Sequence, residues 1–417
     1  MLLRPRRRPA LAGAVAAVVL ALVAGCAGAP EGPAAPAPST SAPSGPTAPP
    51  SEAAPGDPAA LEDAEITTPP PPPESQVDND LVRLAALAER IASRLPTQQR
   101  PAEVVVDGAG EAWVPGSTYR GAFADPDVVR ADGRWWAYAT NTSGRHVPTL
   151  VSDDLRTWTA LGPDALPQVG PWVQGRGGGG GLWAPGVERI GDGWTLAYSA
   201  QYGVVGGQRH NCIGLARGTS PAGPFTHLGD PLACAPSSRQ GVIDPDLYLD
   251  AEGRPWMLWK YSGEYRKRPA GIFSRQLNAD GTDWAPGSQT FEILTFQGGW
   301  EGDTIENPSM VTFRDVTYLF YSGNYWTSAD YATGYAICEG PAGPCGRPSP
   351  LPLLSTATTG HPGPGGATAI VTRDGRRESL RLVYHAWEPG RVGSLRRMRV
   401  AGLFQRPDLT LELVNAG

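Results

Sequence analysis

The sequence predicts an all-β protein, a five-bladed β-propeller, and two observations carry this prediction. From about residue 110 a Pro-bearing start, an apolar strand, a turn and an aromatic-rich strand recur five times, with marker prolines 59, 60, 63 and 56 residues apart: Pro126, Pro185, Pro245, Pro308 and Pro364. The chain also carries 53 Gly and 44 Pro among many short apolar runs, which indicates frequent turns. Short strands repeated radially are typical of a propeller, whereas a linear β-solenoid needs shorter periods and a sandwich does not repeat.

The five copies share one layout. In the first copy, Ala124-Asp125-Pro126 opens an apolar strand, Asp132-Gly133 makes the turn and an aromatic strand follows at residues 135–138. The other four copies open with Trp183-Ala184-Pro185, Ile243-Asp244-Pro245, Glu306-Asn307-Pro308 and Gly363-Pro364-Gly365. We expect the propeller to occupy residues 110–417, with one blade for each copy.

Residues 1–25 have the layout of a bacterial export signal. Four arginines lie in the first nine residues, and the apolar run that follows is shorter than the stretch of about 20 residues that a membrane-spanning helix needs. The run ends in Val23-Ala24-Gly25-Cys26, which resembles the lipobox of bacterial lipoproteins. We therefore expect a lipid anchor on Cys26 that holds the exported protein at the cell membrane, facing the extracellular side. An ordinary secretory signal with an incidental Cys is the alternative.

A predicted linker and one helix separate this signal from the propeller. Residues 26–76 are rich in Pro, Ala and Ser, and every Trp, Tyr and Phe of the chain lies between Trp113 and Phe404, so we expect a disordered stalk. Residues 77–97 carry apolar side chains at helical spacing until Pro96 stops the pattern. We expect a short helix there that braces the propeller and has no chemistry of its own.

The four remaining cysteines fall into two close pairs. Export places them in an oxidising compartment, so we expect the disulfides Cys212–Cys234 and Cys338–Cys345, chosen among three connectivities by sequence distance alone. Zinc binding is disfavoured, because neither pair has C-x-x-C spacing or a nearby pair of histidines.

The charge distribution argues against nucleic acid as a partner. The 35 basic and 41 acidic residues give a net charge of −6, without a basic domain or a Lys/Arg stripe that would neutralise phosphates. We expect a monomer that contacts the membrane through its lipid anchor only.

Three acidic residues open the inner strand of blades one, three and four: Asp125, Asp244 and Glu306. The inner strand of every blade starts near the axis of a propeller, so these residues converge although whole repeats separate them. Like charges in a partly dry funnel raise at least one pKa, which leaves a carboxylic acid beside a carboxylate. Hydrolysis of a glycosidic bond needs both forms: an acid that protonates the leaving oxygen and a carboxylate that activates water. The alternative is that Asp before Pro only caps a turn at the start of the strand.

At these residues the chain resembles glycoside hydrolase family 43, whose five-bladed propellers carry a catalytic Asp, Asp and Glu. The resemblance covers about residues 115–405. Asp125 matches the general base and Glu306 the general acid, although the family more often has Gly where Asn307 stands. Asp244 matches the third-blade Asp that tunes and positions the acid, and Trp183-Ala184-Pro185 matches the second-blade motif.

The resemblance implies an inverting single displacement without a covalent intermediate. Asp125 would activate water and Glu306 would protonate the leaving sugar oxygen, with the two carboxyls roughly 6.5–9.5 Å apart. Asp244 would raise the pKa of Glu306 and orient it. Asp127 and Asp246 lie two residues further along their strands, so they share a strand face with Asp125 and Asp244 and lie deeper in the channel.

The chain departs from the family at the fifth-blade Gly-rich turn. Many relatives place there a His that holds a central calcium or other ion, whereas Gly363-Pro364-Gly365-Gly366 lacks it. His361 is the possible substitute ligand, and we interpret His385 as a structural or substrate-contacting residue. The chemistry is expected to need no cofactor, and the missing His argues against a structural calcium.

Aromatic residues near the funnel are candidate sugar platforms. We assign Trp183 and Trp300 to substrate binding and expect most of the 13 Trp to pack between blades. Ala124 stands where endo-acting arabinanases of the family often have His, which favours an exo-acting α-L-arabinofuranosidase or β-xylosidase. The substrate would be an arabinose- or xylose-containing glycan, from plants or from the cell's own wall.

Three alternatives stay open at this point. One is an endo-arabinanase. Another is a non-catalytic carbohydrate-binding propeller lipoprotein, which would keep the aromatic residues and lose an acid. The third is a retaining fructan hydrolase of the related five-bladed families, with carboxyls about 5–5.5 Å apart; these enzymes carry Arg-Asp-Pro in the third blade, where this chain has Ile243 before Asp244.

Overall fold

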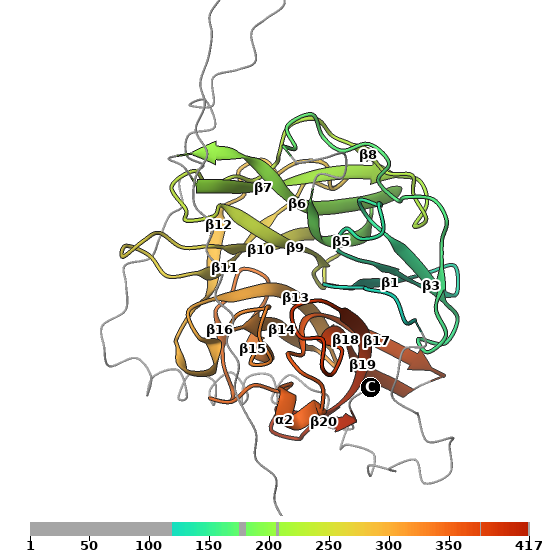
Figure 1. Cartoon of the computed structure of the whole chain (residues 1–417), viewed down its shortest axis with the longest axis vertical. Coiled ribbons are helices and arrows are strands. Elements are labelled where there is room, and N and C mark those ends of the chain that lie inside the picture. Colours follow the sequence, from blue (N-terminus) through green and yellow to red (C-terminus); the bar gives the residue numbers. More distant parts are fainter. Residues whose placement is uncertain (1–118, 175–180, 206–207, 376, 416–417) are drawn as a thin grey trace, which may run out of the picture. The chain divides into compact units, whose positions relative to one another are not determined.

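Five four-stranded antiparallel sheets make up the computed structural model (Figure 1), which describes residues 119–174, 181–205, 208–375 and 377–415. Each sheet uses four strands that are consecutive in the chain, and the inner strand of each sheet contacts the inner strands of both neighbouring sheets. The predicted five-bladed β-propeller is therefore confirmed. The predicted signal (1–25), linker (26–76) and helix (77–97) lie outside the described residues.

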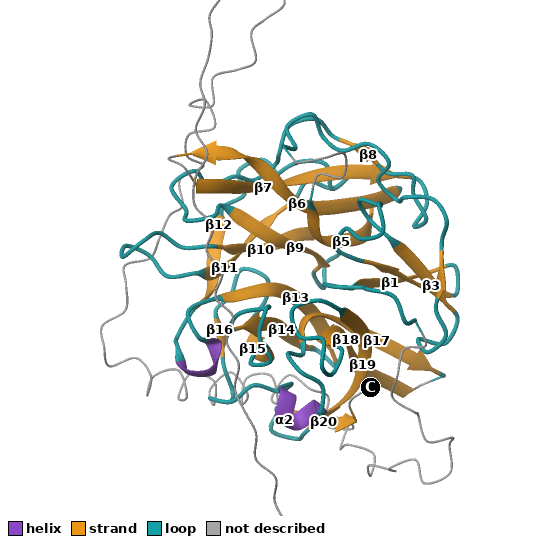
Figure 2. Cartoon of the chain, in the orientation of Figure 1, coloured by secondary structure: helices purple, strands orange, loops and turns teal. Residues whose placement is uncertain are grey.

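Strands dominate the described chain, with two short helical segments, η2 (Gly299–Glu301) and α2 (Thr356–Thr359), in connections (Figure 2). No helix among these residues has the length and apolar character needed to cross a bilayer. The strands, from the first blade to the fifth, are β1 (Asp127–Ala131), β2 (Arg134–Tyr138), β3 (Thr149–Ser152), β4 (Thr159–Ala160), β5 (Leu182–Ile190), β6 (Gly193–Val205), β7 (Gln208–Gly218), β8 (Thr226–His227), β9 (Val242–Leu249), β10 (Pro255–Tyr261), β11 (Gly271–Gln276), β12 (Thr290–Thr295), β13 (Ile305–Phe313), β14 (Val316–Gly323), β15 (Ala332–Cys338), β16 (Cys345–Gly346), β17 (Gly365–Asp374), β18 (Arg377–Trp387), β19 (Arg396–Gln405) and β20 (Leu411–Asn415).

Five hydrophobic clusters fill the spaces between neighbouring blades. The cluster between blades four and five, for example, packs Phe320 and Tyr335 against Leu382 and Tyr384. A fifth cluster joins the last blade to the first around Phe123, whose N–H donates to the carbonyl of Arg396 (3.0 Å). Because apolar burial is the main favourable term in folding, these clusters stabilise the closed ring.

Every inner strand opens with a residue in the left-handed region of backbone space. These residues are Asp125 (φ 50°), Ala184 (42°), Asp244 (58°), Asn307 (49°) and Gly366 (55°). Four of the five are not glycine, and such a backbone costs on the order of 1–3 kcal/mol unless surrounding contacts hold it. In blades two to five the register shifts at this point, so the strand bends where it reaches the axis.

This register corrects two details of the sequence alignment. The residue equivalent to Asp125 and Asp244 in blade four is Asn307, and Glu306 lies one position before it. The fifth-blade equivalent of the marker prolines is Ala367 and not Pro364. The sequence alignment relied on Pro, and the fifth turn reaches the same backbone shape with Gly366-Ala367 instead.

Side chains on the second strand of one blade, or just after it in blade one, hold the left-handed residue of the next blade. In four of the five junctions the backbone N–H of the left-handed residue donates to such a side chain. The pairs are Ala184 to Thr140 Oγ1 (3.0 Å), Asp244 to Ser199 Oγ (2.8 Å), Gly366 to Ser322 Oγ (2.8 Å) and Asp125 to His385 Nδ1 (3.0 Å). In the remaining junction the N–H of Asn307 donates to Asp244 Oδ2 (3.1 Å). These bonds satisfy backbone donors and fix the left-handed backbone at the hub.

A second set of inter-blade bonds lies two residues deeper. Asp127 Oδ2 accepts from the N–H of Val187 (2.7 Å), and its Oδ1 accepts from Thr368 Oγ1 (3.2 Å). Asp246 Oδ2 accepts from the N–H of Met310 (2.9 Å). Burial raises the pKa of Asp127 to about 7 and raises the pKa of Asp246 well above its ordinary value. Both residues therefore join blades together, below the level of Asp125 and Asp244.

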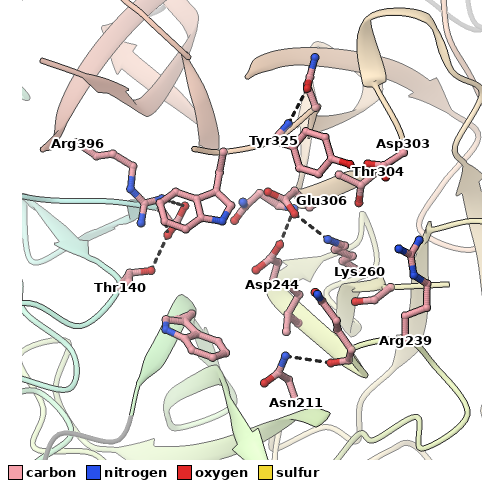
Figure 3. Close-up of a pocket in the computed structure, with 18 residues that line it drawn as sticks. Thr140, Asn211, Arg239, Asp244, Lys260, Asp303, Thr304, Glu306, Tyr325 and Arg396 are labelled. Atoms are coloured by element: carbon pink, nitrogen blue, oxygen red, sulfur yellow. Dashed lines mark hydrogen bonds and ion pairs between the residues drawn. The ribbon is translucent and has the colours of Figure 1, made fainter. Parts of the chain in front are cut away.

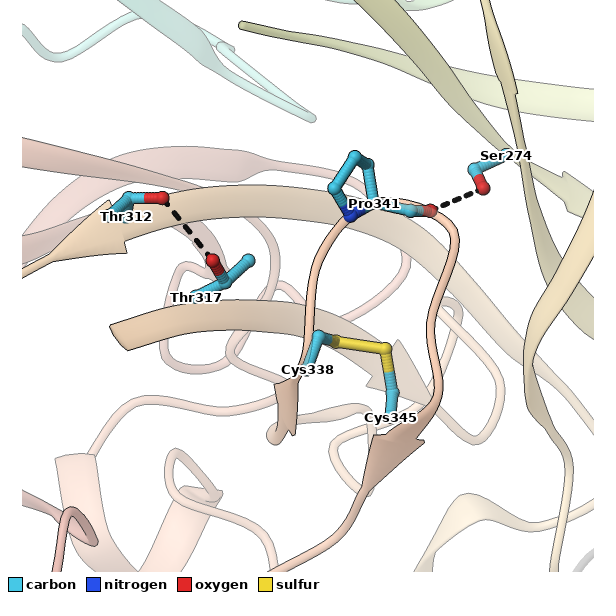
Figure 4. The surroundings of a disulfide bond; sticks show 6 residues. All are labelled: Ser274, Thr312, Thr317, Cys338, Pro341 and Cys345. Atoms are coloured by element: carbon cyan, nitrogen blue, oxygen red, sulfur yellow. Dashed lines mark hydrogen bonds between the residues drawn. A yellow bond between two sulfur atoms is a disulfide. The ribbon is translucent and has the colours of Figure 1, made fainter. Parts of the chain in front are cut away.

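The structure contains both expected disulfides. Cys212 on β7 is bonded to Cys234, and Cys338 on β15 is bonded to Cys345 on β16 (Figure 4). In the turn that the second disulfide closes, the carbonyl of Pro341 accepts from Ser274 Oγ of blade three (2.5 Å). This disulfide therefore sits beside a contact between two blades.

We expect the Asp127→Asn variant to gain stability over the parent as the pH rises. Asp127 has a pKa of about 7 in the folded protein and about 3.9 in the unfolded chain, so its neutral form favours folding. Its contribution to the free energy of unfolding is therefore lost as the pH rises from about 4 to about 7, by up to roughly 1.4 kcal/mol per pH unit. An amide cannot ionise and keeps an acceptor for Val187. Thermal unfolding at pH 5 and pH 8 should show a Tm difference, variant minus parent, that is larger at pH 8. An equal difference at both pH values would contradict the shifted pKa, and Asp192→Asn, an exposed carboxyl, is the control.

Candidate active site

A pocket of about 830 Å³ opens at the axis where the inner strands begin (Figure 3). All three acidic residues singled out in the sequence, Asp125, Asp244 and Glu306, line it. Residues from every blade complete its wall, among them Thr140, Trp183, Asn211, Arg239, Lys260, Ser262, Asp303, Tyr325, Trp326 and Arg396. Convergent polar groups in one concave site are what a small-molecule or sugar site requires.

Asp125 is held as a carboxylate. Its side chain is 11% exposed, Thr140 Oγ1 donates to its Oδ2 (2.6 Å) and Arg396 Nη1 lies 3.2 Å from its Oδ1. Burial acts to raise the pKa of Asp125, but the charge of Arg396 and the Thr140 hydrogen bond lower it below the ordinary value. An ionised carboxylate at this place is able to accept a proton from water.

Asp244 has a raised pKa, in contrast to the lowered pKa of Asp125. Burial and the neighbouring Glu306 raise its pKa well above the ordinary value, and Lys260 only partly offsets them. Asp244 therefore shares its surroundings with Glu306 as a pair of acids that do not both ionise readily.

Glu306 lies between a cation and a phenol. Lys260 Nζ donates to its Oε2 (2.7 Å), and Tyr331 Oη donates to its Oε1 (2.8 Å). Burial acts to lower the pKa of Lys260, but Glu306 and Asp244 raise it above its ordinary value, so the amine is an ammonium. Asp125, Asp244 and Glu306 thus face two cations of the pocket wall, Lys260 and Arg396.

His385 lies beneath the pocket and does not line it, which corrects its reading as a substrate contact. The side chain is fully buried and stacks on Tyr331 (5.8 Å between ring centroids). Its Nδ1 accepts from the backbone N–H of Asp125, so the proton of the neutral ring is on Nε2. Burial and Arg396 lower the pKa of His385 to about 3, which keeps the ring neutral. His385 is therefore a positioning residue for Asp125.

The two tryptophans predicted to bind sugar have different places. Trp183 lines the pocket, whereas Trp300 in η2 stacks on Tyr321 (5.7 Å between centroids) and lies outside the wall. Trp326, which the sequence reading missed, lines the pocket and is 44% exposed. It stacks on Trp387, and the Arg396 guanidinium lies 4.6 Å from its ring centroid. The signal in the sequence was Tyr325-Trp326 directly after the second strand of blade four.

Gly366 occupies the place of the axial metal-binding His that the resemblance implies. No group of three or more His, Cys, Asp or Glu that could hold a metal occurs among the residues that the structure describes. At Gly366, where the family's His would stand, an added Cβ would lie 2.6 Å from His385 and 2.7 Å from Asp125 Oδ1. His361, the substitute ligand suggested by the sequence, follows α2 and does not line the pocket.

The chain is similar to known glycosidases over its propeller. The β-D-galactofuranosidase xynD of Aspergillus niger is 26% identical over 290 residues, which are 64% of this chain and 74% of that protein. The extracellular endo-α-(1→5)-L-arabinanase 1 of Bacillus subtilis is 28% identical over 178 residues, 42% of this chain and 50% of that protein. A solved structure of a thermostable family-43 glycoside hydrolase is 26% identical with a TM-score of 0.62, covering 72% of this chain and 96% of that one.

A five-bladed propeller with three carboxyls around one axial pocket defines the protein as a glycoside hydrolase. The sequence model described as glycosyl hydrolases family 43 matches residues 117–403, so the chain belongs to this family. The resemblance seen at the inner-strand motifs is therefore confirmed, and the protein is an enzyme that hydrolyses glycosidic bonds.

We expect the hydrogen bond from Asp125 to His385 to control kcat. His385→Phe removes the acceptor at Nδ1 and frees the backbone of Asp125, which should lower kcat on a cleaved aryl glycoside on the order of 10- to 100-fold with little change in KM. His385→Asn keeps an acceptor, Oδ1, near the place of Nδ1 and should recover most of kcat. Steady-state kinetics with Tm measurements separate this from loss of fold. Equal losses of kcat in both variants, or a change confined to KM, would show that His385 only fills space.

Proposed function

We propose that the enzyme cleaves its substrate by inverting single displacement, with Asp125 as general base and Glu306 as general acid. The observation that carries the proposal is the division of the pocket: Asp125 lies with Thr140 and Arg396 on one side, and the neighbouring acids Asp244 and Glu306 lie with Lys260 on the other. Asp125 takes a proton from water while the water oxygen bonds to the anomeric carbon. The glycosidic C–O bond breaks, and the leaving oxygen takes the proton of Glu306.

The neighbours of Glu306 support this role. Asp244 disfavours a second negative charge beside it and so helps keep one proton on the pair. Lys260 and Tyr331 donate to the two oxygens of Glu306 and would stabilise the carboxylate that remains after the proton has moved. Over the whole step the charge of the pocket is constant, because Asp125 gains the proton that Glu306 loses.

We propose exo action on an α-L-arabinofuranoside or a β-xyloside. Ala124 stands where endo-acting arabinanases of the family often have His, and curated relatives act on arabinan and on β-D-galactofuranosides. A β-D-galactofuranoside has the same ring configuration as an α-L-arabinofuranoside, so it belongs in the same test. An endo-arabinanase is the second candidate, because a relative of that activity matches. A non-catalytic binder is disfavoured, because all three acids line the pocket.

We also propose that the protein is an exported lipoprotein. It would work as a monomer, anchored to the cell membrane and facing the extracellular side. The signal layout of residues 1–25 and the lipobox at Cys26 support export and anchoring. The two disulfides support an oxidising compartment. The glycan substrate would then be met outside the cell, with membrane contact through the anchor alone.

We expect Asp125→Ala and Glu306→Ala to differ in their dependence on the leaving group. Asp125→Ala should lose about 10²–10⁴-fold in kcat on every substrate, because the attacking water has lost its base. Glu306→Ala should lose a similar factor on sugar leaving groups but less on p-nitrophenyl glycosides, because nitrophenolate leaves with little protonation. A panel of p-nitrophenyl α-L-arabinofuranoside, β-D-xyloside and β-D-galactofuranoside, with matching disaccharides, gives the measurement.

The control is Asp330→Ala, an exposed acid near the pocket that does not line it. Near-parental turnover in the Asp125 variant, or an equal loss in the Glu306 variant on both kinds of leaving group, would contradict the assigned roles. Absence of cleavage of the whole panel by the parent enzyme would contradict the proposed sugar.

A further inference from the structure

We propose that the buried ion pair of Glu301 and Arg347 positions the chain segment that leads into Glu306. This role rests on the proposed function, in which Glu306 is the general acid. Glu301 and Arg347 are positioning residues: neither lines the pocket, and both act through residues 297–304.

Glu301 and Arg347 pair in the interior of the protein. Arg347 Nε lies 2.7 Å from Glu301 Oε1, and the side chains of Arg347 and Glu301 are 11% and 2% exposed. Arg347 Nη2 also donates to the carbonyl of Thr295 at the end of β12 (2.8 Å). One guanidinium therefore holds both ends of residues 295–301. Apolar side chains of similar volume often stabilise a protein as well as a buried ion pair does, so stability alone does not account for these directed bonds.

Glu301 joins this segment to β14 through its side chain and its backbone. Tyr321 Oη of β14 donates to Glu301 Oε1 (2.9 Å), and the backbone N–H of Gln297 donates to Oε2 (2.9 Å). The Glu301 carbonyl accepts from the N–H groups of Asn324 (2.7 Å) and Thr304 (3.3 Å). The carboxylate and the carbonyl therefore fix the backbone around η2 on both sides.

Trp300, which the sequence assigned to sugar binding, packs the same segment onto blade four. Its ring stacks on Tyr321 (5.7 Å between centroids). The ring also lies directly over two glycines: an added Cβ would lie 2.8 Å from it at Gly323 and 2.5 Å from it at Gly334. Such close packing leaves little room for the segment to shift while the bonds of Glu301 hold it.

The Glu301 segment leads into the acid side of the pocket. Asp303 and Thr304 line the pocket, β13 begins at the next residue, and Glu306 follows in that strand (Figure 3). Tyr325 Oη donates to Asp303 Oδ2 (2.7 Å), so the pocket end of the segment is held as well. A misplacement of about 1 Å in a reacting group can cost on the order of 100-fold in rate. The buried pair therefore controls how well Glu306 reaches the leaving oxygen.

The second disulfide fixes the place of Arg347. Cys338–Cys345 closes the turn between β15 and β16 (Figure 4), and Arg347 directly follows β16. β15 pairs in turn with β14, the strand of Tyr321. Arg347 Nε also donates to Tyr321 Oη (2.8 Å), so both partners of Glu301 come from one blade and contact each other.

The test measures how much help the leaving group receives from the acid. The double variant Glu301→Leu with Arg347→Met leaves no buried charge unpaired, so its fold should survive. Its kcat on a disaccharide should fall about tenfold, with a smaller loss on the p-nitrophenyl glycoside of the same sugar and little change in KM. Tyr321→Phe should lower the ratio of the two kcat values, disaccharide over aryl glycoside, by a smaller factor. Arg347→Lys keeps a cation beside Glu301 and should retain most of the parental ratio.

Arg268→Met is the control, because Arg268 forms another partly buried ion pair, with Glu292 (2.6 Å), and does not line the pocket. It should leave the ratio unchanged. An unchanged ratio in the double variant would overturn the positioning role, as would equal losses on both substrates. If the Tm measurement shows that the double variant is unfolded, Tyr321→Phe decides: a lowered ratio supports the role and an unchanged ratio overturns it.

Failure of the proposed function is distinguishable from failure of the positioning role. If the parent cleaves no glycoside of the panel, or if Glu306→Ala loses equally on both leaving groups, the acid role fails. Hydrogen–deuterium exchange of the amides in residues 302–307 then decides the positioning role. Faster exchange in the double variant than in the parent and in Arg268→Met supports it, and equal exchange overturns it.

Discussion

The hydrogen bond between the opening of each inner strand and the preceding blade is the constraint on which the active site depends. It holds a left-handed backbone that most residues avoid, and that backbone turns the side chain of Asp125 or Asp244 toward the axis. In blade four the same position holds Asn307, whose N–H instead binds Asp244. Glu306 then enters the pocket from the neighbouring position. The three carboxyls proposed to be catalytic are thus fixed by contacts between blades and not by any single blade.

The carboxyls differ in their charged neighbours. Arg396 pairs with Asp125 at one side of the pocket, and Lys260 pairs with Glu306 at the other, so each charge in a low-dielectric site has a partner. The pair of Asp244 and Glu306 has one cation for two acids, which favours a retained proton. Below them, Asp127 joins blades with a raised pKa. The hub therefore combines acids that line the pocket with acids that join the blades, two residues apart on the same strands.

Much of this arrangement could be predicted from the sequence, because a repeat of whole blades turns sequence position into position around the axis. The motifs at Asp125 and Asp244 lie where the repeat placed them. Glu306 was assigned to the place of Asp125 and Asp244, although the marker Pro308 aligns Asn307 with that place. Lys260 and Arg396 have no motif around them: their roles follow from which strands face the pocket. For the same reason the sequence could not rank Trp300 against Trp326, since both flank strands of blade four and only Trp326 lines the pocket.

Single displacement requires Asp125 to activate water on the face of the sugar opposite the leaving oxygen. Proton NMR of the first-formed product, recorded before mutarotation and with the glycoside that the enzyme cleaves best, reports this directly. A product of inverted anomeric configuration is what the proposed single displacement predicts. A product that keeps the configuration of the substrate would mean a covalent glycosyl intermediate and would contradict the assignment of Asp125 as a base.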